Sequence, residues 1–354
     1  MNFKNYDLVL ITDEKERLYF LGFHSTAGYV LITPEKKYFV VDDRYVKAAE
    51  KALTKRGIKV LRGSDYSFLK QFAEENGYKT IAVDFTKITV SEYEEMKKLG
   101  FEYVDASVEI RDEMSIKTDE EIKYIAKACD IAERAWKETL PFIKAGVTER
   151  EVANELEYNF KKFGASGTSF DTIVAFGKNA AVPHHETGET KLKDNECVLM
   201  DFGCLYKGYC SDMTRTMFYG EPTEAFRKAY LAVLTAHTKA AEGIKEGISG
   251  KEADKIARDL LESLGYGKYF THSLGHGIGV NIHEYPTLSP RCEARLKNNM
   301  VFSNEPGVYI NGKFGIRIED SCHLVNGKYK SFMKDDKSLI ILGGDKIRKE
   351  KLYK

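Results

Sequence analysis

The chain has 354 residues, of which 54 are acidic and 54 are basic, so its formal net charge at neutral pH is zero. A content of 43% hydrophobic and 31% charged residues is typical of a water-soluble globular protein, and this length favours two domains over one. The balanced charge gives no indication of nucleic acid as a partner, and no apolar run approaches the roughly 20 residues that span a membrane.

Predicted strands and helices alternate through the first part of the chain. Strands are expected at 7–11, 28–33, 37–43, 58–62 and 79–85, and helices at 45–56 and 66–76. This alternation indicates a small α/β domain with a mixed sheet. Thr118 and Glu121 then form a capping box that opens a long amphipathic helix over 119–140. We therefore expect a boundary near residue 114, with domains at 1–114 and 115–354.

The second domain contains an internal repeat. Residues 143–151 resemble residues 244–252, because both place Ile-Lys-x-Gly before a Ser/Thr-x-x-Glu capping box. Both segments then enter a helix that ends in glycine, at Gly164 and Gly265. Capped helices can resemble one another by chance, but the shared Ile-Lys-x-Gly favours a duplicated half-domain. A site at the interface of the two halves is then expected.

The segment 198–216 reads as a first acidic hairpin. With its turn at Tyr206–Gly208, Asp201 is expected directly opposite Asp212, with Cβ atoms about 5 Å apart. Two carboxylates in this arrangement repel each other unless one is protonated or a cation lies between them. The alternative is an exposed acidic turn, and the apolar residues that precede Asp201 argue against it.

The segment 304–320 reads as a second acidic hairpin, with Asn311–Gly312 at its turn. A plain two-residue turn would pair Glu305 with Ile318, whereas a three-residue loop or a bulge would bring Glu305 opposite Glu319. Arg317 lies two residues before Glu319 on the same face. We expect it to hold the Glu319 carboxylate through charge-assisted hydrogen bonds.

Several histidines lie close in sequence to the two acidic hairpins. His276 lies between glycines that allow close backbone approach, and further histidines stand at His184, His185 and His283. Each alone is as often structural as functional. Two Asp, two Glu and one His form an oxygen-rich set that suits Mn, Co, Fe or Zn ions. A paired-metal site acidifies a water molecule and suits hydrolysis of an amide bond, and the sequence has no H-E-x-x-H, G-x-S-x-G or P-loop motif for a rival chemistry.

The six cysteines are scattered and form no Cys-x-x-Cys pair, so neither a zinc ribbon nor a disulfide scaffold is indicated. The N-terminal residues lack the apolar core and the cleavage pattern of a signal peptide. A reducing cytoplasm is the expected location.

Five motifs together closely resemble the Xaa-Pro aminopeptidase and prolidase family of pita-bread metallopeptidases. They are LMDFG (199–203), SDMTRT (211–216), SLGHGIG (273–279), NEPGVY (304–309) and IRIED (316–320). The resemblance covers residues 110–345 and, more loosely, the N-terminal domain. It implies a small N-terminal creatinase-like α/β domain, a pseudo-two-fold pita-bread (creatinase/aminopeptidase) catalytic domain, and a homodimer.

The resemblance also implies roles for individual residues. Two divalent metal ions, expected to be manganese although Co, Zn and Fe share these ligands, would be bound by Asp201, Asp212, His276, Glu305 and Glu319. Asp212 and Glu319 would bridge the pair, and Glu305 would also shuttle a proton. His184 would stabilise the transition state, and His283 would contact the scissile carbonyl. Arg317 would support the site or the substrate.

The implied activity is a cytosolic exopeptidase that cleaves the bond before proline in short peptides with proline in the second position. Thr287 stands where some dipeptide-specific relatives carry arginine, which leans away from a strict dipeptidase. The chain begins almost at its first strand, without the N-terminal helix common in relatives, so homodimer contacts through that helix are not expected.

Two alternatives stay open. A methionyl aminopeptidase shares the ligand set, but that group usually lacks a separate N-terminal α/β domain of this length. A metal-free binding protein on the same fold is opposed by the five filled ligand positions.

Overall fold

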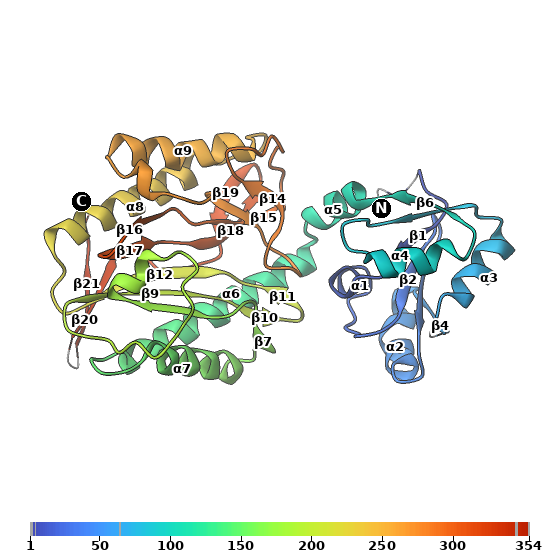
Figure 1. Ribbon diagram of the computed structural model, residues 1–354, viewed down its shortest axis with the longest axis horizontal. Coiled ribbons are helices and arrows are strands. Elements are labelled where there is room, and N and C mark those ends of the chain that lie inside the picture. The colour runs from blue at the N-terminus through green and yellow to red at the C-terminus, as the bar shows by residue number, and fades with distance from the viewer. Residues whose placement is uncertain (1–2, 4, 64, 344–345, 353–354) are drawn as a thin grey trace. The chain divides into compact units, whose positions relative to one another are not determined.

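The computed structural model describes residues 3, 5–63, 65–343 and 346–352. The chain folds into two compact units, Met1–Met114 and Ser115–Lys354 (Figure 1). Within the described ranges, no helix combines the length and the apolar character needed to cross a membrane. The six cysteines are all unbridged.

The N-terminal unit is built on a mixed sheet of order β4-β3-β2-β1-β5-β6. Its strands are β1 (Val9–Ile11), β2 (Tyr29–Ile32), β3 (Lys37–Val41), β4 (Lys59–Arg62), β5 (Thr80–Val83) and β6 (Glu102–Asp105). Its helices are α1 (Glu14–Leu21), α2 (Val46–Leu53), α3 (Ser67–Asn76), α4 (Val90–Lys97) and α5 (Ser107–Ser115), with a 3-10 turn at Thr54–Arg56. The central strand β1 pairs antiparallel with β2 and parallel with β5, so the predicted mixed α/β architecture is confirmed.

The predictions missed short elements of this unit, namely α1, α4, α5 and β6. α1 carries little apolar periodicity, and its ends are set by local chemistry instead. The Asp13 side chain accepts hydrogen bonds from the N–H groups of Lys15 and Glu16, and Gly22 ends the helix in a left-handed conformation.

The second unit contains two helix pairs and two larger sheets, of order β21-β20-β12-β9-β8 and β14-β13-β15-β18-β19. Its helices are α6 (Asp119–Thr139), α7 (Glu149–Lys162), α8 (Glu224–Gly243) and α9 (Gly250–Ser263), with 3-10 turns at Leu140–Phe142, Gly177–Ala181 and Gly267–Tyr269. Figure 1 shows α6 and α7 on one side of the strands and α8 and α9 on the other.

The strands of the second unit fall into three groups along the chain. The first comprises β7 (Gly167–Thr168), β8 (Ile173–Phe176), β9 (Glu196–Phe202), β10 (Cys204–Tyr206), β11 (Tyr209–Cys210) and β12 (Met213–Tyr219). The second comprises β13 (Gly275–Gly277), β14 (Glu284–Leu288), β15 (Val301–Asn304), β16 (Gly307–Ile310), β17 (Phe314–Arg317), β18 (Asp320–Val325) and β19 (Lys328–Ser331). The last comprises β20 (Leu339–Gly343) and β21 (Lys346–Glu350).

The predicted duplication is present in the backbone hydrogen bonds. α7 and α9 each have 14 residues and each begin with a complete capping box, on Thr148 and on Ser249. The N–H groups of the first helical residues then donate to matching positions of a following segment. These bonds are Glu149 to Thr190 and Arg150 to Gly188 in the first half, and Gly250 to Ala294 and Lys251 to Cys292 in the second. The two halves therefore place equivalent loops against equivalent helix starts.

Candidate metal centre

The first acidic hairpin forms with a different register from the one predicted. Asp201 on β9 pairs with Thr214 on β12, not with Asp212. The turn is centred on Lys207 and Gly208, which both have positive φ (53° and 85°), as in the turns that match strand twist. The predicted direct opposition was wrong by two residues. Because side chains alternate with a period of two, Asp212 stays on the side of Asp201, and both line one cleft.

The second hairpin has the register in which Glu305 lies opposite Glu319, as predicted for a three-residue loop or a bulge. Ile310 pairs with Phe314, which leaves a three-residue loop. The pairing of Asn304 with Asp320 continues the same register, so Glu305 lies opposite Glu319. The loop option in the prediction is confirmed.

Arg317 does not hold Glu319 as predicted. Its guanidinium donates to Asp201 Oδ2 at 2.5 Å and to Thr214 Oγ1 at 3.0 Å. The Thr214 hydroxyl in turn donates to Glu319 Oε2 at 2.6 Å. Arg317 therefore joins the two hairpins, with its charge on the Asp201 side and a neutral hydroxyl between it and Glu319.

His276 is oriented for ligation. Its Nδ1 lies 3.1 Å from the Gly277 carbonyl, so Nδ1 carries the proton and Nε2 is left free. Nε2 lies 3.3 Å from Glu305 Oε1 and 3.5 Å from Asp212 Oδ2. A Cβ on Gly275 would come within 2.1 Å of the Ser303 carbonyl oxygen, so β13 can approach β15 this closely only with glycine beside His276.

One group of residues meets the geometry of a metal site directly. Ligand atoms of Asp212, His276 and Glu319 all lie within 4.8 Å of one another. Glu305 lies beside this group, in contact with His276. Asp201 is close enough for its charge to raise the pKa of Asp212. All five line the same cleft.

The acids of this cluster have raised pKa values, because they are buried together with too few cations to balance their charge. Burial, reinforced by Glu319 and Asp201, raises the pKa of Asp212 well above its usual range. Burial, then Glu305 and Asp201, raises the pKa of Glu319 in the same way. Burial raises the pKa of Glu305 to about 8 and lowers that of His276 to about 4. The imidazole is therefore neutral near pH 7, as a metal ligand must be.

The residues fit divalent cations. Asp201 Oδ1 and Glu319 Oε1 are buried and have no hydrogen-bond partner among the described residues. Such an arrangement is costly unless a proton or a cation compensates it. The donor set of carboxylate oxygens with one imidazole suits Mn, Co, Fe or Zn.

The centre lies in a cleft of about 930 Å³. His184 and His283 both line it, together with Arg317 and the predicted ligands. The ring centroids of His276 and His283 are 4.3 Å apart in an edge-on arrangement. Burial, followed by the proximity of His184, lowers the pKa of His283. The structure thus brings together all the residues that the sequence predicted for the site.

Sequence reasoning missed a chain of polar groups beside the centre. Arg317 donates to the Tyr309 hydroxyl at 2.6 Å, and this hydroxyl lies 2.8 Å from His272 Nε2. His272 Nδ1 lies 2.8 Å from the Ser273 carbonyl. Tyr309 ends the NEPGVY motif and His272 directly precedes the SLGHGIG motif, but only the fold brings the two side chains into contact.

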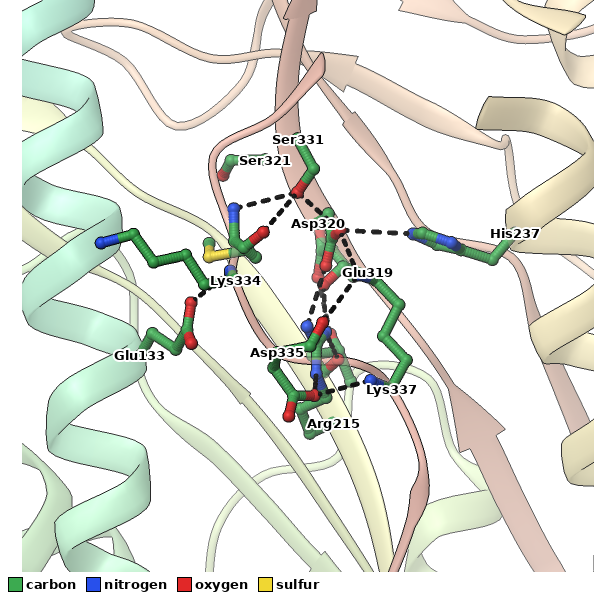
Figure 2. A network of polar contacts seen from close by, with 12 residues as sticks. Glu133, Arg215, His237, Glu319, Asp320, Ser321, Ser331, Lys334, Asp335 and Lys337 are labelled. Atoms are coloured by element: carbon green, nitrogen blue, oxygen red, sulfur yellow. Dashed lines mark hydrogen bonds and ion pairs between the residues drawn. The ribbon is translucent and has the colours of Figure 1, made fainter. Parts of the chain in front are cut away.

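A second polar network lies on the other side of Glu319 (Figure 2). Arg215 donates to the Glu319 carbonyl oxygen at 2.6 Å and to Asp320 Oδ1 at 2.9 Å. Its Nε bonds Asp335 at 3.0 Å, and Lys337 lies 2.8 Å from Asp320 Oδ2. The hydrogen bond from Arg215 therefore ties the backbone of Glu319 to a set of buried ion pairs that do not line the cleft.

Comparison with known proteins agrees with this geometry. Residues 123–326 match the model of metallopeptidase family M24, and residues 1–113 match the creatinase/prolidase N-terminal domain. The chain is 38% identical over 347 residues to an Xaa-Pro dipeptidase of Pyrococcus horikoshii, covering 96% of each chain. It is similar to the structure of an Xaa-Pro dipeptidase from Bacillus anthracis, with a TM-score of 0.92, 39% identity and 96% of each chain covered. An X-Pro aminopeptidase from Thermotoga maritima is also similar, with a TM-score of 0.89, 34% identity, and 96% of this chain and 98% of that chain covered.

Proposed function

The chain belongs to metallopeptidase family M24, and from this premise we propose that it is an exopeptidase with two metal ions that hydrolyses the bond before proline in short peptides. The observation that carries the proposal is the group of ligand atoms from Asp212, His276 and Glu319 in one cleft, where oxygens of Asp201 and Glu319 are buried without a hydrogen-bond partner among the described residues. The relatives named above as Xaa-Pro peptidases support the choice of substrate.

The two ions would be held by Asp201, Asp212, His276, Glu305 and Glu319, and Asp212 and Glu319 would be the ligands that both ions share. Bound divalent cations would supply Lewis acidity, which lowers the pKa of a water molecule and stabilises the negative charge on an attacked carbonyl oxygen. Manganese is the proposed native metal. A preparation with two Mn per chain by mass spectrometry supports this assignment, and a preparation active with a single ion per chain overturns the paired site.

Three side chains of the cleft have proposed roles toward the peptide. Glu305 accepts the proton of the attacking water and delivers it to the departing proline nitrogen, which has no proton of its own before cleavage. His184 donates to the oxygen on which charge develops, and His283 contacts the scissile carbonyl. Arg317 holds Asp201 in place from the wall of the cleft.

One kinetic panel tests the substrate class. With added Mn, an Xaa-Pro dipeptide, an Xaa-Pro-Yaa tripeptide and a Met-Ala-Yaa peptide should be compared, with an Xaa-Ala dipeptide as the matched control. We expect cleavage of the two proline peptides. Cleavage of the Met-Ala-Yaa peptide alone would assign a methionyl aminopeptidase instead. Folded protein that binds no metal would favour a binding module.

The panel also separates an aminopeptidase from a dipeptidase. Thr287 lines the cleft and carries no charge, so no cation at this position fixes the carboxylate of a dipeptide. We propose that tripeptides are accepted as well as dipeptides. A rate on the dipeptide that exceeds the tripeptide rate by 10² or more overturns this preference.

We further propose a cytoplasmic homodimer. The six unbridged cysteines support a reducing location. Sedimentation of the purified protein measures the oligomeric state, and a mass equal to one chain overturns the dimer.

A further inference from the structure

Glu149, the first residue of α7, is fully buried against the loop that carries His184. Its carboxylate accepts four hydrogen bonds, all from residues between 176 and 188. The donors are the Phe176 N–H (2.9 Å), Asn179 Nδ2 (2.8 Å), His185 Nε2 (2.9 Å) and the Gly188 N–H (3.1 Å). Two carboxylate oxygens offer about four acceptor positions, so the loop occupies nearly all of them.

His184 has no tether of its own. Its side chain is exposed into the cleft, and its ring makes no hydrogen bond to any residue that the structure describes. Its neighbours hold it instead. The Pro183 carbonyl accepts from Arg317 at 3.4 Å, and His185 bonds Glu149. The direction of the His184 side chain is therefore set by bonds on either side of it.

The equivalent helix of the duplicated half forms without an acid at this place. Gly250 stands in α9 where Glu149 stands in α7, directly after the capping residue. α9 nevertheless has the same length, a complete capping box and the matching backbone bonds. A Cβ on Gly250 would come within 2.2 Å of the Thr287 carbonyl oxygen, so in that half the helix packs directly on the neighbouring segment. The half that carries His184 instead has a buried acid at this place.

We propose that Glu149, acting through His185, is a positioning residue that holds His184 in its productive place in the cleft. The proposal rests on the proposed role of His184 and adds to it a pair of residues that are not among the proposed metal ligands, of which Glu149 is fully buried. Loss of the tether lets the loop move, and small displacements of a catalytic group cost rate strongly. The effect is expected on kcat more than on KM, because binding of the peptide relies on the rest of the cleft.

The test compares Glu149→Gln with Glu151→Gln. Both replace an acid by its amide in the first turn of α7, but Glu151 bonds Thr148 and not the loop. We expect Glu149→Gln to lower kcat by about 10-fold with KM changed less than threefold. Glu151→Gln should keep the wild-type kcat, and Mn titration calorimetry should give the same affinity for both variants. Equal kcat in the two variants, or lost Mn binding in Glu149→Gln alone, overturns the proposal. His185→Gln serves as a milder second variant, with kcat expected to fall about threefold.

A double-mutant cycle separates positioning from general destabilisation. In a His184→Ala background, Glu149→Gln should lower kcat less than twofold further. A full 10-fold effect in that background overturns the proposal.

Hydrogen exchange in metal-free protein provides a readout that needs no activity. The amides of Phe176 and Gly188 should exchange faster in Glu149→Gln than in the wild type or in Glu151→Gln. Unchanged exchange overturns the tether. A wild-type protein that fails to cleave Xaa-Pro peptides overturns the proposed function instead, and the exchange result stays interpretable.

Discussion

Glu319 and Asp320 are neighbours in the chain, and both are buried, but they face opposite environments. Glu319 is 1% exposed and Asp320 is 0% exposed. Glu319 faces three other acids of the cleft, and its pKa is raised. Burial would raise the pKa of Asp320 as well, but Arg215 and Lys337 lower it below its usual range. Among the described residues Glu319 forms no ion pair, whereas Asp320, the next residue in the chain, pairs with two cations.

The difference shows that two adjacent buried acids can serve different purposes, one in a structural network of ion pairs and the other in the cleft. The cost of burying a carboxylate is similar on both sides, so the supply of cations decides the outcome. Behind Glu319, Arg215 and Lys337 neutralise Asp320 and Asp335 (Figure 2). In front, Arg317 bonds Asp201, one of the proposed ligands. The front cluster therefore has an excess of negative charge that external cations would compensate.

The most severe test of this contrast is Asp212→Asn. Because Asp212 is a proposed bridging ligand, its amide should weaken metal loading and lower kcat/KM by roughly 10³ or more, equivalent to several kcal/mol of lost charge stabilisation. Metal content and turnover measured on the same preparation check this. A rate within tenfold of the wild type contradicts the bridging role.

The second test compares stability in metal-free protein. Asp320→Asn removes the charge that pairs with both Arg215 and Lys337, leaves Arg215 with Asp335 alone, and should lower the free energy of unfolding by about 3–5 kcal/mol. Glu319→Gln should be neutral or stabilising, because it removes a source of repulsion. The fluorescence of Trp136, the one tryptophan of the chain, reports urea unfolding of the second unit. Equal losses in both variants would remove the distinction between the clusters.

His184→Ala tests whether the cleft works through the metal ligands alone. Since His184 is not a proposed ligand, the variant should keep its metals, while kcat falls by roughly 10², in keeping with the loss of one transition-state hydrogen bond. Mn binding and kcat are the measurements. Loss of metal in this variant would instead place His184 among the ligands.

The smallest effect concerns a buried acid far from either cluster in the chain. Burial, then a shared hydrogen bond with Asp84, raises the pKa of Glu16 to about 9. The folded state therefore keeps a proton that the unfolded state loses above about pH 4.5, so stability declines as pH rises from there toward 9. Glu16→Gln should flatten this decline and raise the Tm by a few degrees at pH 8, with little change at pH 4. Calorimetry at the two pH values checks it, and equal shifts at both would show that titration of Glu16 is not the cause.

Local patterns predicted much of the fold. The capping box at Thr118, the alternation of the N-terminal sheet and the repeat at 143–151 and 244–252 all correspond to observed features. These signals succeed because capping, period and turn chemistry act within a few residues. The predicted register of the first hairpin was wrong because Lys207 adopts a positive φ in the turn, and lysine is not a residue type that predicts this conformation.

Local sequence patterns were enough to predict which residues line the cleft: acids on paired strands, a histidine between glycines, and two further histidines nearby. They were not enough to predict which charged residues pair with those acids or lie behind them. Arg317 reaches Asp201 across 116 positions, Arg215 reaches Asp335 across 120, and Glu149 reaches Gly188 across 39. Such partners are chosen by packing, because a buried charge bonds whatever the fold brings within about 3 Å, and sequence spacing carries no record of that distance.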